Sequence, residues 1–418
     1  MSTDDLFHAQ RDHVFFTWSV QRDVAPLEIV EAEGARFRTR AHGWLFDLES
    51  QVYNVGCGHR HPHIQRRMIA QIEALPAAMP NAVLPIRAEL GHLLARHTGL
   101  AKAFLATGGS EANENAVKMA RLLTGRSKII TRRNSYHGAT LGMLGIAGDD
   151  RKRPFAADLA PAIHVDDPYP VPPHAHDQPS AWVASLEAVL EREGPRTIAA
   201  VLLEGFTGTN GMQLPPADFW PRVRALCDEH GILLISDEVF SGFGRTGEWF
   251  AVDHWAVRPD MIVMGKGLTS GYAPLAGVMV SDAIADHFDE HKLWCGLTTY
   301  AHPVSCAAAV GAIEVLERED LPGNAARVGA ALAARLDALD HIPAIAGSIV
   351  DHRGLGLMRR VELDRPAAPL GHLALERGLY LPTKGNAFFV CPPLCLTLAE
   401  ADAIADRLAE SLTALVAR

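Results

Sequence analysis

The chain has 418 residues, of which 48% are hydrophobic and 21% are charged, enough for one large and one smaller globular domain. Its formal net charge of −10 argues against a nucleic-acid-binding protein, and no apolar run is long enough to span a membrane. The six cysteines form no CxxC pair and the polar N-terminus does not resemble a signal peptide, so we expect a cytoplasmic protein without a metal site.

The N-terminal residues predict a β-rich segment followed by two helices. Residues 27–50 alternate apolar and polar side chains around two glycines, which indicates hairpin strands. Helices are expected after residue 61 and over residues 85–97. Trp18 lies in an aromatic cluster just before the strands. Such a cluster usually serves core packing, and the wall of a substrate pocket is the less favoured alternative.

A strand, a glycine-rich turn and a helix are expected over residues 103–126. Gly109 and Ser110 stand where the helix begins, and the free amides of a helix N-terminus favour a phosphate group. The pattern is neither a Walker A loop nor GxGxxG, which weakens an interpretation based on nucleotide binding. A tight turn capped by Ser110 explains the same residues without any ligand.

Each of the next two strands ends in, or leads to, a side chain that could take part in catalysis or ligand binding. A strand near 128–132 leads to a turn with Tyr136 and His137, and a strand near 198–204 ends in Glu204. Tyr136 can lie flat on an aromatic ligand or serve only the turn. The alternation of strands and helices from about residue 100 to 280 predicts a mostly parallel sheet covered on both faces. Residues 167–180 indicate an exposed loop.

Two apolar runs, at residues 232–235 and 261–264, look like buried strands of that sheet. Asp237 follows the first run and Lys266 follows the second. Because ligands bind at the carboxyl ends of such strands, both groups are expected at one crevice. A lysine that forms a Schiff base, with an acid that keeps a pyridine nitrogen protonated, is what pyridoxal phosphate chemistry requires. A surface aspartate and a surface lysine remain the alternative.

With these residues in view, the chain resembles the class III aminotransferases of the fold type I pyridoxal phosphate enzymes. The resemblance covers nearly the whole length and depends on five motifs in the order of the family: TGGSEANENA, SYHGAT, DEVFSGFGRTG, GKGLTSGYAPLAG and TYAHP. The segments VFFTWSVQ and GNAFFVCPPL are most similar to the branch of taurine–pyruvate and other omega-aminotransferases.

The resemblance implies pyridoxal 5'-phosphate as cofactor and a role for each matching residue. Lys266 matches the Schiff-base lysine and Asp237 the partner of the ring nitrogen. Thr298 matches a threonine that reaches the phosphate from the neighbouring subunit, which implies a homodimer and leaves a tetramer open; Thr299 beside it competes for that contact. The further cofactor contacts that the resemblance implies are Gly109, Ser110, Tyr136, His137, Glu204 and Val239, and the substrate pocket would include Trp18, Tyr136 and Lys384.

The implied fold is an α/β fold with a large cofactor domain, at residues 60–320, whose central sheet is covered by helices. A smaller α+β domain combines the N-terminal segment 1–59 with the C-terminal part 321–418. The two parts are expected to be joined through a long helix that begins near Pro303.

Two departures from the family bear on the substrate. Thr209 stands where the ornithine and γ-aminobutyrate branches have a switching glutamate. Pro382 stands where the omega branch has a carboxylate-binding arginine, and the nearest cation is Lys384, which lacks the bidentate fork of arginine. The neighbouring Phe388 and Phe389, together with the N-terminal aromatic cluster, favour a substrate with an apolar or extended body. A keto acid such as pyruvate would need another clamp.

The implied activity is transfer of an amino group from an amine or amino acid to a keto acid or aldehyde, such as pyruvate, by a ping-pong mechanism through Lys266. An epimerase, aminomutase or decarboxylase on the same fold would share the lysine and the aspartate. A non-catalytic binding protein is a further alternative, which the intact site residues disfavour. A nucleotide-dependent enzyme is disfavoured because no P-loop is present.

Overall fold

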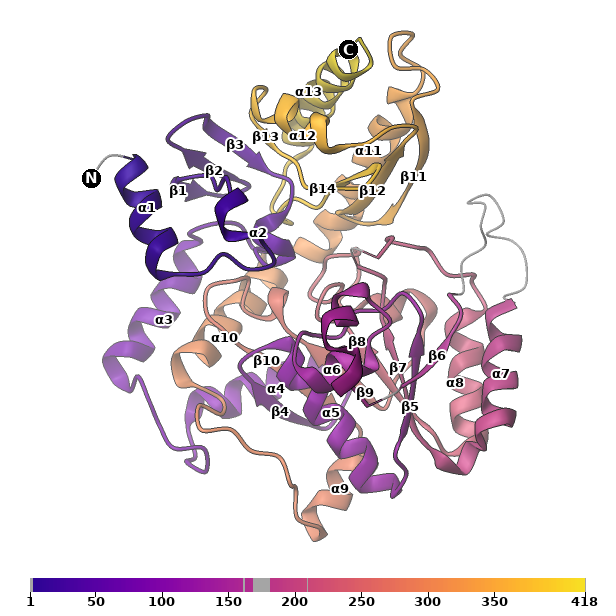
Figure 1. Cartoon of the computed structure of the whole chain (residues 1–418). Helices are drawn as coiled ribbons and strands as arrows, with labels where there is room; N and C mark the ends of the chain where they lie inside the picture. The colour runs from indigo at the N-terminus through magenta and orange to yellow at the C-terminus, as the bar shows by residue number, and fades with distance from the viewer. Residues whose placement is uncertain (1–2, 161, 168–180, 209, 418) are drawn as a thin grey trace.

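A seven-stranded sheet forms the centre of the larger part of the molecule in this computed structural model, which describes residues 3–160, 162–167, 181–208 and 210–417 (Figure 1). Its strand order is β4-β10-β9-β8-β7-β5-β6. All neighbouring strands are parallel except at β10, which runs antiparallel to both β4 and β9. The strands are β4 (Lys102–Ala106), β5 (Lys128–Arg132), β6 (Ile163–Val165), β7 (Ile198–Glu204), β8 (Leu233–Asp237), β9 (Met261–Met264) and β10 (Ala276–Val280). The predicted mostly parallel sheet is thus confirmed.

Helices cover both faces of this sheet, which explains why its central strands are mainly apolar and almost entirely buried. Every residue of β7, β9 and β10 is buried. Along β7, Val201 and Leu203 belong to one core cluster while Leu202 belongs to the other, as the two-residue period of a strand requires. The helices of this part are α3 (Pro62–Ala74), α4 (Pro85–Thr98), α5 (Gly109–Thr124), α6 (Leu141–Ile146), α7 (Ala181–Glu193), α8 (Phe219–His230), α9 (Asp282–Glu290) and α10 (Pro303–Arg318).

Both ends of the chain build a smaller lobe beside the large sheet (Figure 1). One four-stranded sheet has the order β1-β2-β3-β13, and its last strand, from the C-terminal part, pairs parallel with β3. A second sheet has the order β11-β12-β15-β14. The strands are β1 (Ile29–Glu33), β2 (Arg36–Thr39), β3 (Gly43–Asp47), β11 (Ile349–Leu355), β12 (Met358–Leu363), β13 (Leu379–Tyr380), β14 (Thr383–Lys384) and β15 (Ala387–Val390); the helices are α1 (Thr3–His13), α2 (Ser50–Tyr53), α11 (Leu321–Leu339), α12 (Ala368–Leu375) and α13 (Leu398–Val416).

The smaller α+β part made from both chain ends is as expected, and α10 begins at Pro303 as the sequence predicted. The exact boundaries at residues 59/60 and 320/321 stay a prediction. Most of the predicted loop at 167–180 lies outside the described residues. Within the part of the chain that the structure describes, no helix is both long and apolar enough to cross a membrane.

A buried arginine fastens the two parts together. Arg245, from the FGRTG motif, is 3% exposed, and its Nη1 donates hydrogen bonds to the carbonyl oxygens of Leu357 (3.3 Å) and Pro392 (2.5 Å). Its Nη2 donates to Ser50 Oγ at 3.4 Å. These acceptors belong to the N-terminal and the C-terminal segments of the smaller lobe. One side chain of the large part therefore satisfies backbone and hydroxyl groups of both chain ends.

Candidate active site

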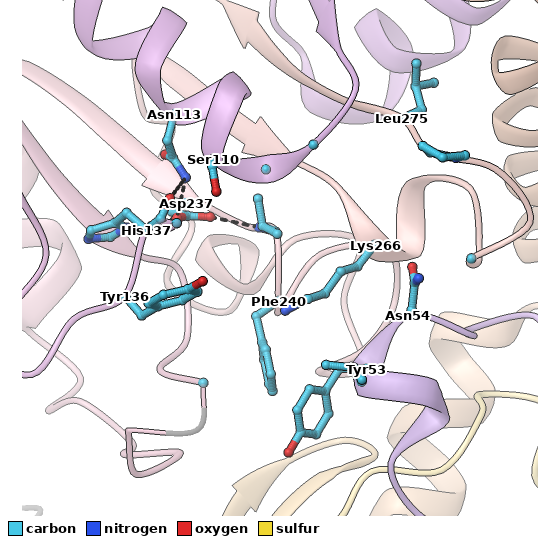
Figure 2. Close-up of a pocket in the computed structure, with 18 of the residues that line it drawn as sticks. Tyr53, Asn54, Ser110, Asn113, Tyr136, His137, Asp237, Phe240, Lys266 and Leu275 are labelled. Carbon is cyan, nitrogen blue, oxygen red and sulfur yellow. Dashed lines mark hydrogen bonds and ion pairs between the residues drawn. The ribbon is translucent and has the colours of Figure 1, made fainter. Parts of the chain in front are cut away.

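A cavity of about 580 Å³ lies at the carboxyl ends of the parallel strands (Figure 2). Asp237, the last residue of β8, and Lys266, two residues after β9, both line it. The N-terminus of α5 contributes Gly109 and Ser110, and the turn after β5 contributes Tyr136. The structure thus brings together side chains that are far apart in the sequence, at the edge of the sheet where an open α/β fold binds its ligand.

Three donors hold the carboxylate of Asp237, which is 4% exposed. Its Oδ2 accepts hydrogen bonds from Asn113 Nδ2 and from His137 Nδ1, each at 2.8 Å, and its Oδ1 accepts one from the backbone N–H of Val239 at 3.0 Å. An ionised carboxylate only accepts hydrogen bonds, so His137 must carry its proton on Nδ1. Asp237 is thereby fixed in orientation and still has acceptor capacity on Oδ1 toward the cavity.

Lys266 occupies an environment that disfavours its own charge. Its Nζ lies 4.5 Å from the ring centroid of Phe240 and 5.8 Å from that of Tyr53. Burial lowers the pKa of the Lys266 ammonium group to about 8, although Asp237 and Glu204 oppose the shift. The backbone of Lys266 has a φ of 41°, a conformation that costs energy in a residue with a Cβ. An amine with a lowered pKa at the floor of a cavity can serve as nucleophile and as base.

The start of α5 forms a cradle suited to an anion. The helix runs from Gly109 to Thr124, so the amides of its first turn have no partner within the helix. A Cβ added at Gly109 would lie 3.0 Å from Val239 Cγ1, so glycine keeps the two segments in close approach. Ser110 Oγ accepts a hydrogen bond from the N–H of Ala139 at 3.0 Å, which ties the turn after β5 to the helix start.

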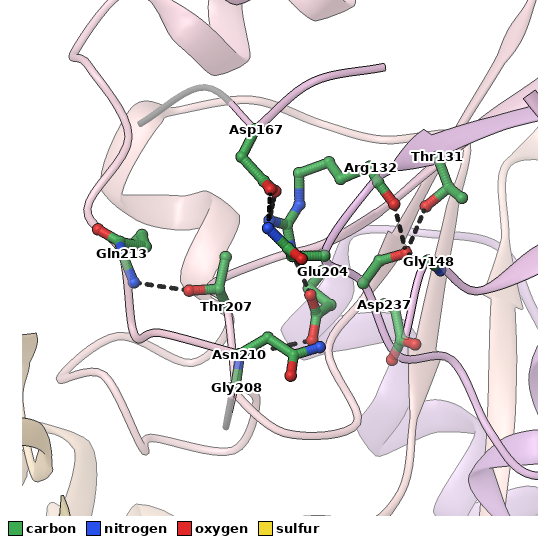
Figure 3. Close-up of polar contacts among 12 residues, drawn as sticks. Thr131, Arg132, Gly148, Asp167, Glu204, Thr207, Gly208, Asn210, Gln213 and Asp237 are labelled. Carbon is green, nitrogen blue, oxygen red and sulfur yellow. Dashed lines mark hydrogen bonds and ion pairs between the residues drawn. The ribbon is translucent and has the colours of Figure 1, made fainter. Parts of the chain in front are cut away.

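Glu204 lines the cavity, and its carboxylate is held by the neighbouring Arg132 (Figure 3). Arg132 Nη2 donates to Glu204 Oε2, and Arg132 Nη1 donates to Asp167 Oδ1 at 2.6 Å. Burial raises the pKa of Glu204, and the guanidinium group of Arg132 opposes this shift. A direct contact of Glu204 with a cofactor stays a prediction, because the hydrogen bonds of its carboxylate here link β7 to β5 and to the backbone N–H of Gly208.

Several predicted site residues do not reach this cavity within the chain. Lys384 is exposed on β14, and its Nζ donates to Asn210 Oδ1 at 3.3 Å instead of lining the cavity. Phe388 and Phe389 are buried in β15 and do not line it either. Thr298 is exposed on the segment between α9 and α10. Thr209 lies outside the described residues.

Trp18, predicted either as packing or as a pocket wall, lines the cavity and is 65% exposed. Within the single chain it therefore belongs to the wall of the cavity and not to the core.

Three residues that line the cavity contact Asp237 or Lys266 and were not predicted from the sequence. Asn113 orients Asp237, and its position inside the TGGSEANENA motif was the signal that could have found it. Phe240 and Tyr53 pack beside the lysine amine. Tyr53 closes a run from Ser50 in which four non-glycine residues have φ between 48° and 61°, a strained left-handed turn that no sequence pattern announces.

The cavity also contains an arginine that the sequence analysis did not single out. The Cζ of Arg151 lies 3.7 Å from the ring centroid of Tyr136 and 5.4 Å from that of Trp18. Its Nε and Nη2 donate to Asp149 Oδ1 and Oδ2 at 2.7 and 2.9 Å. The cavity therefore presents a second cation beside Lys266, stacked on the aromatic side chain of the turn after β5.

Comparison with known proteins agrees with this geometry. The model of the class-III aminotransferase family matches residues 17–412. The omega-aminotransferase of Caulobacter vibrioides is 32% identical over 423 residues, which span 93% of this chain and 92% of that protein. Acetylornithine aminotransferase 1 of Bordetella pertussis is 35% identical over 376 residues, 86% of this chain and 90% of that protein. The crystal structure of taurine:2-oxoglutarate aminotransferase from Bifidobacterium kashiwanohense, in complex with PLP and glutamate, has a TM-score of 0.94 at 29% identity and covers 100% of this chain and 99% of that one.

Proposed function

Since the chain belongs to the class III aminotransferases and is a transaminase that depends on pyridoxal 5'-phosphate, we propose that it is an omega-type enzyme with pyruvate as an amino acceptor. Its donor would be a primary amine or amino acid with an apolar or extended body, because the aromatic side chains of Trp18, Tyr53 and Phe240 line the cavity. The observation that carries the proposal is the meeting of Asp237, Lys266 and the start of α5 in one cavity.

The residues of the cavity fit the cofactor. The cradle at Gly109 and Ser110 suits its phosphate group, and Val239, whose methyl groups reach Gly109, would pack against one face of the ring. Asn113 Oδ1 is buried and has no hydrogen-bond partner among the described residues, as expected of a group beside a site that holds a polar ligand. Bound there, pyridoxal phosphate supplies an aldehyde that captures the donor amine and a ring that accepts electrons from the reacting carbon.

Each side chain then has a distinct task. The Lys266 amine would hold the cofactor covalently and, once released, would move a proton at the α-carbon of the donor, for which a pKa near 8 is well placed. Asp237 would keep the ring nitrogen protonated, supported in its orientation by Asn113 and His137. Tyr136 would stack over the ring. Phe240 and Tyr53, whose rings lie beside the amine, would limit the access of water to it.

A homodimer with shared active sites is part of the proposal. Thr298 is exposed and outside the cavity of its own chain, which is what a residue that completes the phosphate site of a neighbouring subunit requires. The molecular mass of the protein in solution, measured by light scattering, would test the dimer and would distinguish it from a tetramer of two such dimers. We also place the enzyme in the cytoplasm, since all six cysteines are free and a reducing compartment keeps them so.

A nitrogen-15 transfer assay tests the function. Holoenzyme is incubated with pyruvate and, in turn, labelled taurine, β-alanine or 1-phenylethylamine, and the alanine formed is analysed by mass spectrometry. We expect labelled alanine with at least one donor, and no labelled alanine from Lys266→Ala, whose turnover should fall by at least about a hundredfold while its fold is retained. Labelled donor that is only epimerised, rearranged or decarboxylated would contradict the proposal and favour another reaction on the same fold.

A further inference from the structure

We propose that Arg151 binds the carboxylate of the acid substrate, in place of the arginine that the sequence lacks near residue 382. This inference rests on the proposed function, since it concerns the substrate of the same cavity. Of the described residues that line the cavity, only Arg151 and Lys266 carry an arginine or lysine side chain. Because Lys266 is committed to the cofactor and the reacting carbon, Arg151 is the cation that remains for an anionic group.

The hydrogen bonds of Arg151 leave one edge of its guanidinium group open. Asp149 occupies the Nε–Nη2 edge through both carboxylate oxygens, at 2.7 and 2.9 Å. No hydrogen bond from Nη1 to any described residue is present, so the edge formed by Nη1 and Nη2 can meet a second carboxylate. Two parallel N–H donors in a planar fork are the arrangement that recognises a carboxylate in a defined orientation.

The position of the guanidinium group is fixed by its surroundings. It stacks on Tyr136, with 3.7 Å between Cζ and the ring centroid, and the ring centroid of Trp18 lies 5.4 Å from the same atom. Stacking on an aromatic face and a two-point ion pair leave an arginine few alternative rotamers, so little freedom remains to be lost when a substrate binds. Tyr136 is the residue proposed to stack on the cofactor, and Arg151 lines the same cavity as Tyr136, Asp237 and Lys266.

Asp149 explains how one cavity can receive both an acid and an amine without an acid group. Its carboxylate also accepts hydrogen bonds from the N–H of Arg151 at 2.8 Å and from Asn210 Nδ2 at 3.4 Å. An unpaired cation is unfavourable where its side chain is mostly buried, as that of Arg151 is, and the ion pair with Asp149 offsets that cost when the bound substrate has no carboxylate. When a keto acid is bound, it adds charge-assisted hydrogen bonds on the other edge without having to displace Asp149.

Lys384, the cation that the sequence offered for this task, supports the pair from a distance. Its Nζ donates to Asn210 Oδ1, and Asn210 in turn donates to Asp149. The chain of contacts therefore runs from Lys384 through an amide to the partner of Arg151. Lys384 is a positioning residue in this scheme, and the substrate contact belongs to Arg151.

The test compares Arg151→Gln with Arg153→Gln, a control on the same 3₁₀ helix whose side chain is 78% exposed and pairs with Asp150. Each holoenzyme is assayed with one good amine donor and two acceptors, pyruvate and propanal. For Arg151→Gln we expect the KM for pyruvate to rise roughly 10- to 100-fold, the loss typical of a hydrogen bond to a charged group, while kcat/KM for propanal stays within about 2-fold. Arg151→Lys should recover part of the loss, and Arg153→Gln should change neither acceptor.

Binding of propionate, an unreactive carboxylate, gives a readout that does not depend on turnover. Its dissociation constant from holoenzyme, measured by calorimetry, should rise by the same factor in Arg151→Gln as the KM for pyruvate. Equal losses with pyruvate and propanal would mean that Arg151 only supports Tyr136, and unchanged values would also overturn the inference. A wild-type enzyme that transfers no nitrogen to pyruvate yet binds propionate through Arg151 would contradict the proposed function and leave the inference about Arg151 standing. Should Arg151→Gln fail to fold, Arg151→Lys is used instead, and its KM for pyruvate and its dissociation constant for propionate are compared with the wild-type values in the same way.

Discussion

At the scale of single residues, Lys266 is a charged group held in surroundings that disfavour its charge. Its ammonium group is surrounded by Phe240 and Tyr53, and burial lowers its pKa to about 8, against about 10.4 for a lysine in an unfolded chain. Below pH 8 the amine is charged in both the folded and the unfolded chain, so the folded protein bears the whole free-energy cost of burying that charge. Between the two pKa values only the unfolded chain binds the proton, so the penalty shrinks as the pH rises.

This predicts that Lys266→Met stabilises the cofactor-free protein at neutral pH. The gain in free energy of unfolding should be roughly 1–3 kcal/mol at pH 7 and should disappear gradually between about pH 8 and 10.5. Urea unfolding of the two proteins at a series of pH values measures it. Lys292→Met, at an exposed lysine, serves as the control and should show no such trend. A wild-type protein that is the more stable of the two at pH 7 would contradict the burial of this charge.

The sequence could predict that Lys266 and Asp237 meet at one crevice, because both follow strongly apolar strands and the position of a strand end needs only local information. Asn113 and Arg151 escaped prediction for a physical reason. Their long-range contacts depend on which segment lies opposite: Asn113 meets Asp237 across 124 residues of chain, and Arg151 lies near Trp18 of the N-terminal segment. Lys384 was chosen as a clamp for its place in the sequence, yet its side chain contacts Asn210 outside the cavity.

At the scale of elements, the start of α5 forms the proposed phosphate cradle, and a Cβ added at Gly109 would come within 3.0 Å of Val239 Cγ1. We predict that Gly109→Ala raises the dissociation constant of pyridoxal phosphate about 10-fold or more, because the new Cβ would push Val239 out of place or tilt the phosphate cradle. Cofactor titration followed by tryptophan fluorescence measures this.

The matched control is Gly91→Ala in α4, where an added Cβ meets no atom within 4 Å. This variant should bind the cofactor normally and gain about 0.5–1 kcal/mol in stability, because alanine suits a helix interior better than glycine. Equal cofactor affinity in the two variants would mean that the close approach at Gly109 has no part in binding.

The elements themselves were predictable to different degrees. Residues 261–264 form β9 as expected, because four consecutive apolar residues suit a strand buried on both faces. The reversed direction of β10 could not be read from its sequence. An apolar run shows that a strand is buried but not which way it points, and here the direction follows from pairing with β4 and β9.

At the scale of the whole molecule, Arg245 joins the large sheet to both chain ends that form the smaller lobe. We predict that Arg245→Met lowers the free energy of unfolding by about 2–4 kcal/mol, because it leaves buried carbonyl groups without a donor. Chemical unfolding by urea measures the effect, with Arg22→Met, at a side chain that is 86% exposed, as the control. Equal unfolding midpoints for the two variants would show that the arginine does not hold the parts together.

The covalent link between pyridoxal phosphate and the Lys266 amine is the claim on which all proposed residue roles depend. Reduction of the holoenzyme with borohydride makes that link permanent, and peptide mass spectrometry then locates it. We expect one pyridoxyl phosphate adduct per chain, on Lys266. An adduct on another lysine, or a fully active enzyme that borohydride leaves unmodified, would contradict the assignment of this cavity as the active site.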